Sequence, residues 1–155
     1  MDTIQFFIVE YIDKEFEIHH PETDISINGR SLIDVVQEIE HAALNLQNER
    51  DSSRRSYAGL NPAWRPNLRN ELLGNTREPY SVVLTCTCYE DWCNSVLTKI
   101  AIDAQTITWR DFTSVLYGEE SRSWGGVPID YSALGPFVFD RKQYLEALDA
   151  LGLDK

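Results

Sequence analysis

Hydrophobic and polar residues alternate at a period of two in three consecutive segments between residues 82 and 109. In the first segment Val82, Leu84 and Cys86 fall on one face, and the intervening residues fall on the other. The apolar pairs at 100 and 102 and at 107 and 109 repeat this spacing after short polar turns. Many residues in these segments are β-branched, which favours extended backbone. The pattern therefore predicts three sequential strands that form an antiparallel meander.

The N-terminal segment also has the composition of strands. Residues 4–12 predict a strand that is too apolar to lie at the surface. Residues 14–19 alternate and predict a second strand with one solvated face. Residues 21–24 have turn-forming composition, and residues 25–27 predict a short third strand. Asn28 and Gly29 then predict a turn, because both tolerate positive φ.

The pattern changes to a helical period after residue 30. Ser31 and Asp34 have the spacing of a capping box, so an amphipathic helix is expected over residues 31–46. We expect Ile39 to lie in the core and Asp34, Glu38 and Glu40 to face solvent. The expected core face consists of Leu32, Val35, Val36, Ile39, Ala42, Ala43 and Leu46.

The end of the chain predicts a short strand followed by a helix. Residues 136–139 are apolar, and Asp140 has the character of an N-cap with Gln143 at the reciprocal position. Phe139 is then placed to pack as a staple against Tyr144. The helix is expected over residues 141–151, with Tyr144, Leu145, Leu148 and Leu151 on its core face.

Two stretches lack a regular period. Residues 47–79 are polar and rich in turn formers, with one helical turn expected at residues 68–73 before Gly74. Residues 118–135 predict another loop. Long irregular stretches of this kind are typical of binding segments or of disorder.

Strands and helices are segregated along the chain rather than alternating, which predicts an α+β fold. We expect an antiparallel β-sheet, made of the N-terminal strands and the central meander, with helices at residues 31–46 and 141–151. A length of 155 residues fits one domain spanning residues 1–155.

The apolar runs, the N-terminal residues and the cysteines together predict the cellular compartment. No apolar run reaches the roughly 20 residues that span a bilayer, and the N-terminus has no basic segment typical of a signal peptide. Three cysteines, an odd number, favour a reducing compartment. The sequence therefore predicts a cytoplasmic protein that does not bind membranes.

The net charge of −11 argues against direct nucleic-acid binding, because neutralisation of phosphates normally dominates that binding. The charge is uneven, since residues 1–46 carry ten acidic residues and only two basic ones. Residues 47–79 carry six arginines against four acidic residues. Two interpretations stay open: a solvated acidic surface that aids solubility, and a negative face that steers a basic protein partner.

Three cysteines lie close together in sequence, and three thiolates can bind zinc when a fourth ligand is present. The candidate metal ligands are Cys86, Cys88 and Cys93, with His19, His20 or His41 as the fourth. The histidines are distant in sequence, and buried cysteines commonly serve as small hydrophobic residues. We therefore expect no bound metal and no other cofactor.

The sequence contains no known catalytic motif. The nucleophile elbow, the zinc-protease helix motif, the phosphate-binding loop and the dinucleotide-binding glycine pattern are all missing from the chain. Carboxylates are plentiful, but neighbouring carboxylates on a surface do not by themselves form a catalytic pair. We expect that the protein is not an enzyme.

Six short motifs lie at residues 25–34, 57–60, 73–74, 86–93, 107–112 and 134–144. Together they resemble a broad family of small bacterial proteins, some of which are similar to immunity proteins of contact-dependent growth inhibition systems. The resemblance implies a protein that binds and neutralises a cognate toxin domain by stoichiometric inhibition. The implied toxin is a basic nuclease, such as an RNA-cleaving enzyme.

The chain departs from that family's pattern at the cysteines. The family has glycines between the second and third cysteines and a tryptophan after the third. Here residues 89–92 are Tyr-Glu-Asp-Trp, and Asn94 follows Cys93. A metal-binding module built on the cysteines and an enzyme using carboxylates and a histidine therefore stay open as alternatives.

Two acidic loops are the predicted toxin-binding sites. Both carry adjacent carboxylates beside a tryptophan, and tight interfaces combine a buried aromatic anchor with charges at the rim. The predicted contact residues are Glu90, Asp91, Trp92, Glu119, Glu120 and Trp124. The acidic N-terminal strands between residues 10 and 24 are the second choice.

Overall fold

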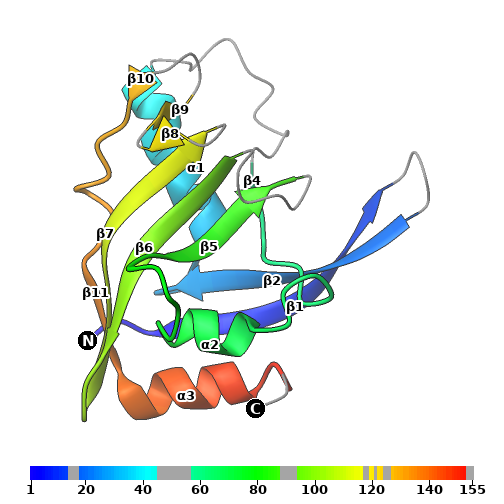
Figure 1. Ribbon diagram of the computed structural model, residues 1–155, viewed down its shortest axis with the longest axis vertical. Helices are drawn as coiled ribbons and strands as arrows, with labels where there is room; N and C mark the ends of the chain where they lie inside the picture. Colours follow the sequence, from blue (N-terminus) through cyan, green and yellow to red (C-terminus); the bar gives the residue numbers. More distant parts are fainter. Residues whose placement is uncertain are drawn as a thin grey trace.

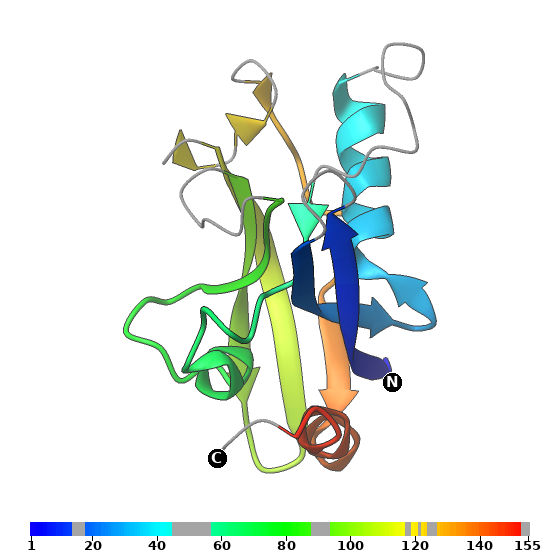
Figure 2. The same cartoon turned by 90° about the vertical axis from the view of Figure 1, so that its right-hand side faces the viewer.

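The computed structural model describes residues 1–13, 18–44, 57–87, 94–116, 119–120, 122–123 and 127–152. These residues form an α+β fold, as predicted, in which helices pack on antiparallel sheets (Figure 1). The view turned by 90° shows α1 and the N-terminal strands on one side of the large sheet (Figure 2).

The large sheet contains the predicted meander. Strands β5 (Ser81–Cys86), β6 (Asn94–Ile102) and β7 (Thr106–Leu116) are antiparallel neighbours in sequence order. β11 (Phe137–Asp140) extends the sheet beyond β7, and β4 (Tyr57–Ala58) pairs with β5 at the other edge. The meander and the strand before the last helix are thus confirmed.

Three short strands lie where the sequence predicted only a loop. They are β8 (Glu119–Glu120), β9 (Arg122–Ser123) and β10 (Val127–Pro128). β8 pairs with the end of β7, and β9 pairs with β10. Strands of two residues are too short to show a period of two, so the sequence pattern could not reveal them.

The predicted alternation of faces in β5 is interrupted by one shift in register, and both faces of the strand are covered. Val83, Leu84 and Thr85 are all buried, although consecutive residues of a regular strand point to opposite faces. The pairing of β5 with β6 shifts register between Val82 and Leu84. Such an irregularity interrupts the strict alternation from which the two faces were predicted.

The N-terminal sheet differs from its prediction in the number and extent of its strands. β1 (Ile4–Asp13) pairs over its whole length with one strand, β2 (Ile18–Ile27), and β3 (Arg30–Ser31) adds to the end of β2. The turn expected at residues 21–24 and the separate strand at 25–27 are therefore wrong. Asn28 and Gly29 do form the predicted turn, with φ of 53° and 81°.

Pro21 lies within β2 without breaking its pairing with β1, for a geometric reason. The N–H of Thr23 donates to the Leu60 carbonyl at 2.7 Å, so it points away from β1. Because the backbone direction repeats every two residues, the nitrogen of Pro21 also points away from β1. Its missing N–H therefore removes no hydrogen bond between the two strands.

Helix α1 (Leu32–Leu44) forms where predicted, but its buried face is rotated from the prediction. Leu32, Val36 and Glu40 are buried at a spacing of four residues, with Glu40 only 1% exposed. Ile39 is half-buried against the core. The expectation that Glu40 faces solvent is wrong, because Glu40 lies on the same buried face of α1 as Leu32 and Val36.

The two remaining helices agree with their predictions. α2 (Leu68–Leu72) ends before Gly74, which has a φ of 76°. α3 (Arg141–Asp149) begins after Asp140, whose side chain accepts a hydrogen bond from the Gln143 N–H at 3.0 Å. The Gln143 side chain does not complete the expected capping box, because its amide bonds to the backbone of β1.

Trp109 occupies the centre of the core. Its ring packs edge-to-face against Phe139 and Tyr144, with ring centroids 5.8 and 6.2 Å apart. The indole N–H donates to the Tyr144 hydroxyl at 3.1 Å, and that hydroxyl donates to the Leu72 carbonyl. This chain of contacts joins β7, β11, α3 and α2.

Candidate functional site

Most of the residues predicted to bind a toxin fall outside the described parts of the chain. These are Glu90, Asp91, Trp92 and Trp124. Glu119 and Glu120 form β8, whose residues pair with Leu116 and Val115 at the end of β7. The structure therefore does not test whether the two acidic loops form one surface, and their role stays a prediction.

The predicted metal ligands are only partly described. Cys86 ends β5 and is half-buried, whereas Cys88 and Cys93 lie outside the described residues. His20 lies in β2 with its ring edge-on to Trp64, at a centroid distance of 6.3 Å, and His41 lies on α1. Among the described residues, no three histidine, cysteine or acidic side chains gather to hold a metal ion.

A buried carboxylate lies between α1 and the strands. Glu40 accepts hydrogen bonds through one oxygen from the hydroxyls of Tyr57, at 2.5 Å, and Tyr131, at 2.7 Å. Burial first, and then the charge of Glu40, raises the pKa of both tyrosines, so their hydroxyls stay protonated donors. The arrangement ties α1 to β4 and to the segment before β11.

Sequence analysis missed this cluster, although the sequence contains a signal for it. Glu40 follows Leu32 and Val36 at intervals of four residues, which is the spacing of one helix face. Buried acidic residues are rare unless they have hydrogen-bonding partners. The two tyrosine partners are distant in sequence, so the pattern alone could not identify them.

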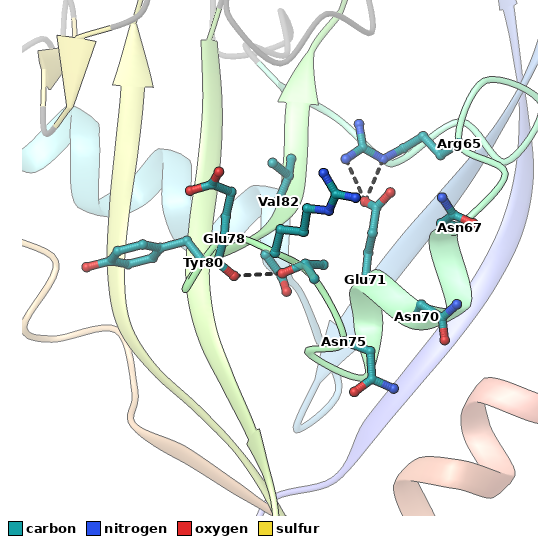
Figure 3. A pocket seen from close by; sticks show the side chains of 11 residues that line it. Arg65, Asn67, Asn70, Glu71, Asn75, Glu78, Tyr80 and Val82 are labelled. Carbon is teal, nitrogen blue, oxygen red and sulfur yellow. Dashed lines mark hydrogen bonds and ion pairs between the residues drawn. The ribbon is translucent and has the colours of Figure 1, made fainter.

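A polar pocket of about 490 Å³ lies between α2 and the start of β5 (Figure 3). On its α2 side, Arg65 donates to a Glu71 oxygen from two nitrogens, at 3.0 and 2.6 Å. Asn67, Asn70 and Asn75 add amide groups to the same wall. Its described lining includes no histidine and no cysteine, the usual general base and the strongest natural nucleophile.

The β1–β2 ribbon, meaning residues 4–13 and 18–27, has one half anchored to the core. Ile4, Phe6, Ile25 and Ile27 are buried, and the Phe6 ring packs edge-to-face on Tyr144 at 5.5 Å. This anchoring positions the other half of the ribbon, which leads away from the body of the described structure (Figure 1).

The outer half of the ribbon exposes large apolar side chains on both faces. The side chains of Phe7, Ile8, Val9, Tyr11 and Ile12 are between 43% and 50% exposed. The expectation that residues 4–12 are too apolar for the surface is wrong for this half, because the ribbon extends beyond the core. Contiguous exposed apolar surface of this kind marks interaction sites.

Aromatic and acidic groups surround this apolar surface. Trp64, which is 57% exposed, lies beside His20, and His20 pairs across the ribbon with Tyr11. Residues 1–13 and 18–27 contain five acidic residues and no lysine or arginine, although Glu22 is buried and Asp2 bonds Asn28 at the anchored end. Exposed aromatic rings beside charges of one sign are the composition of a protein-binding surface.

None of the described helices is long and apolar enough to cross a membrane. Comparisons of this chain with protein families, with curated proteins and with solved structures find no match.

Proposed function

We propose that this protein is an immunity protein that binds a basic toxin domain, a nuclease, in the cytoplasm and neutralises it by stoichiometric inhibition. The observation that carries the proposal is the acidic ribbon with its exposed apolar outer half. This surface combines the two features that a tight complex with a basic protein requires, namely apolar area for affinity and negative charge for steering.

The charge supports a nuclease as the partner. A nuclease holds phosphates with lysines and arginines, and carboxylates of an inhibitor can occupy the same positions. The net charge of −11 would raise the association rate with such a partner and would disfavour nucleic acid itself. The sequence resemblance to immunity proteins points to the same class of partner.

The ribbon now takes precedence over the two predicted acidic loops as the main contact surface. Its apolar side chains lie on a folded strand pair, whereas composition alone supports the loops. The residues from Glu90 to Trp92 and from Glu119 to Trp124 remain proposed as secondary contacts.

An immunity gene is expected to lie immediately downstream of its toxin gene, so the test uses the toxin domain encoded by the gene immediately upstream. Co-expression with this protein should restore growth, and purified protein should abolish nuclease activity at a ratio of one to one. Val9→Lys should weaken binding by about tenfold or more, because it places a positive charge in the contact surface. Ile102→Lys is the matched control, since Ile102 has a similar exposure of 41% and lies at the far end of β6.

The proposal fails if the upstream toxin domain does not bind, or if it binds and stays active. Equal effects of Val9→Lys and Ile102→Lys would show that the ribbon is not the contact surface.

A further inference from the structure

The outer edge of β1 is the side of the strand that faces away from β2. The N–H of Ile4 donates to the side-chain oxygen of Gln143 at 3.2 Å, and the Ile4 carbonyl accepts from the Gln143 amide at 2.7 Å. On the opposite side, Thr3 exchanges hydrogen bonds with Asn28. Gln143 therefore binds Ile4 with one donor and one acceptor, as the backbone of a neighbouring strand would.

This edge continues along β1 beyond Gln143. Because the backbone direction repeats every two residues, the N–H and C=O groups of Ile8 and Ile12 point the same way as those of Ile4. Within the described parts of the chain, no strand and no side chain pairs with these groups of Ile8 and Ile12. An apolar strand edge of this kind is a template on which another chain can add a strand.

We infer that the toxin domain adds a strand to this edge, pairing with β1 over residues 8–12 and extending the N-terminal sheet. This inference rests on the proposed function and specifies how the partner binds. Backbone hydrogen bonds to β1 supply part of the affinity, and contacts with alternate side chains supply specificity.

The side chains beside the edge fit an added strand. Phe7, Val9 and Tyr11 lie on one face of β1, and Ile8 and Ile12 lie on the other. An added strand would place its own side chains beside both rows. Exposed side chains on both faces leave room for such contacts along the whole outer half of the ribbon.

The charges favour a basic partner over a second copy of this chain. Pairing of two ribbons would bring exposed carboxylates of one copy, such as Glu10, close to those of the other. Like charges at short range oppose association, whereas lysines or arginines flanking the added strand would be attracted. Glu10, in the middle of the outer half, places a carboxylate beside the added strand.

The test compares two substitutions of one residue, measured against the purified toxin domain. Ile8→Pro removes the N–H from the outer edge, and Ile8→Thr keeps that N–H while it removes most of the apolar side chain. Ile8→Pro should weaken binding by about 30-fold or more, and Ile8→Thr by less than about tenfold. Thermal melts of both variants check that the fold is retained.

A second measurement needs no variant. In the unbound protein the amides of Ile8 and Ile12 should exchange with solvent faster than those of Phe7 and Val9, which bond to β2. In the toxin complex the amides of Ile8 and Ile12 should become protected.

The possible outcomes separate this inference from the proposed function. Binding with no protection at Ile8 and Ile12, and equal effects of the two Ile8 variants, would overturn strand addition while the proposed function stands. A lack of binding by the unmodified protein would overturn both. A dimer of the unbound protein that Ile8→Pro dissociates would show that the edge takes a second copy, and would also overturn the inference.

Discussion

Replacement of Glu40 by alanine gives the sharpest stability test of this fold. The substitution removes the acceptor of two tyrosine hydroxyls, at 2.5 and 2.7 Å, in a position that is only 1% exposed. A buried donor left without an acceptor costs about 1–3 kcal/mol. Two such hydroxyls give about 2–6 kcal/mol, and the lower part of that range is expected because the substitution also removes the cost of burying the Glu40 carboxyl group.

Urea denaturation of the variant and of the unmodified protein measures the change in the free energy of unfolding. Glu40→Ala should lower that free energy by about 2–4 kcal/mol, which corresponds to about 2–4 °C in melting temperature for each kcal/mol. Glu40→Gln, which keeps an acceptor oxygen, should lose less than the alanine variant.

Glu38→Ala is the matched control on the same helix, with the same change in helix propensity. Glu38 is 64% exposed and pairs with Arg30 at 2.8 Å, so its loss should cost less than about 1 kcal/mol. Equal destabilisation by Glu38→Ala and Glu40→Ala would refute the buried position of Glu40 and the rotation of α1 inferred from it.

Three further predictions concern pH, a helix cap and metal content. Burial raises the folded-state pKa of Tyr57, Tyr131 and Tyr144, so the stability from these groups is complete below the unfolded tyrosine pKa of about 10. Above that pH the free energy of unfolding should fall by up to about 4 kcal/mol per pH unit for the three groups. Absorbance that shows all seven tyrosines of the chain ionised near pH 10, with the fold intact, would contradict this. Asp140→Ala should cost about 0.5–2 kcal/mol in urea melts, because Asp140 accepts from the Gln143 N–H, and Asp140→Asn should cost less. The purified protein should contain no stoichiometric zinc; elemental analysis that finds one zinc per chain, lost together with stability on Cys88→Ser, would overturn that expectation.

Local periodicity predicted the parts of the fold that depend on neighbouring residues. The meander, the strand before α3 and the capping of α3 by Asp140 all follow from short-range patterns, and the structure confirms them. Pro21 made the local sequence predict a turn instead of a continuous strand, because whether a proline breaks a strand depends on which way its nitrogen points. That direction is a property of strand pairing, which the local sequence does not specify.

The candidate surface could not be predicted from local sequence for a related reason. The apolar residues of β1 predict a strand, but the same residues are compatible with burial in the core or with exposure to a partner. Whether a residue of β1 is buried or exposed depends on where the ribbon leaves the core. That position depends on the long-range packing of Phe6 against Tyr144. Glu40 is buried for a similar reason, since its partners Tyr57 and Tyr131 are remote in sequence.

The central claim is that this protein inhibits a basic toxin domain by binding it. Titration calorimetry of the purified protein with the toxin domain encoded immediately upstream tests this most directly, with residual nuclease activity measured at each ratio. We expect a complex of one to one, with nuclease activity falling in proportion to the complex formed. Because steering by charge acts on association, added salt should slow association more than it speeds dissociation. No heat of binding, or a complex in which the nuclease remains active, would contradict the account.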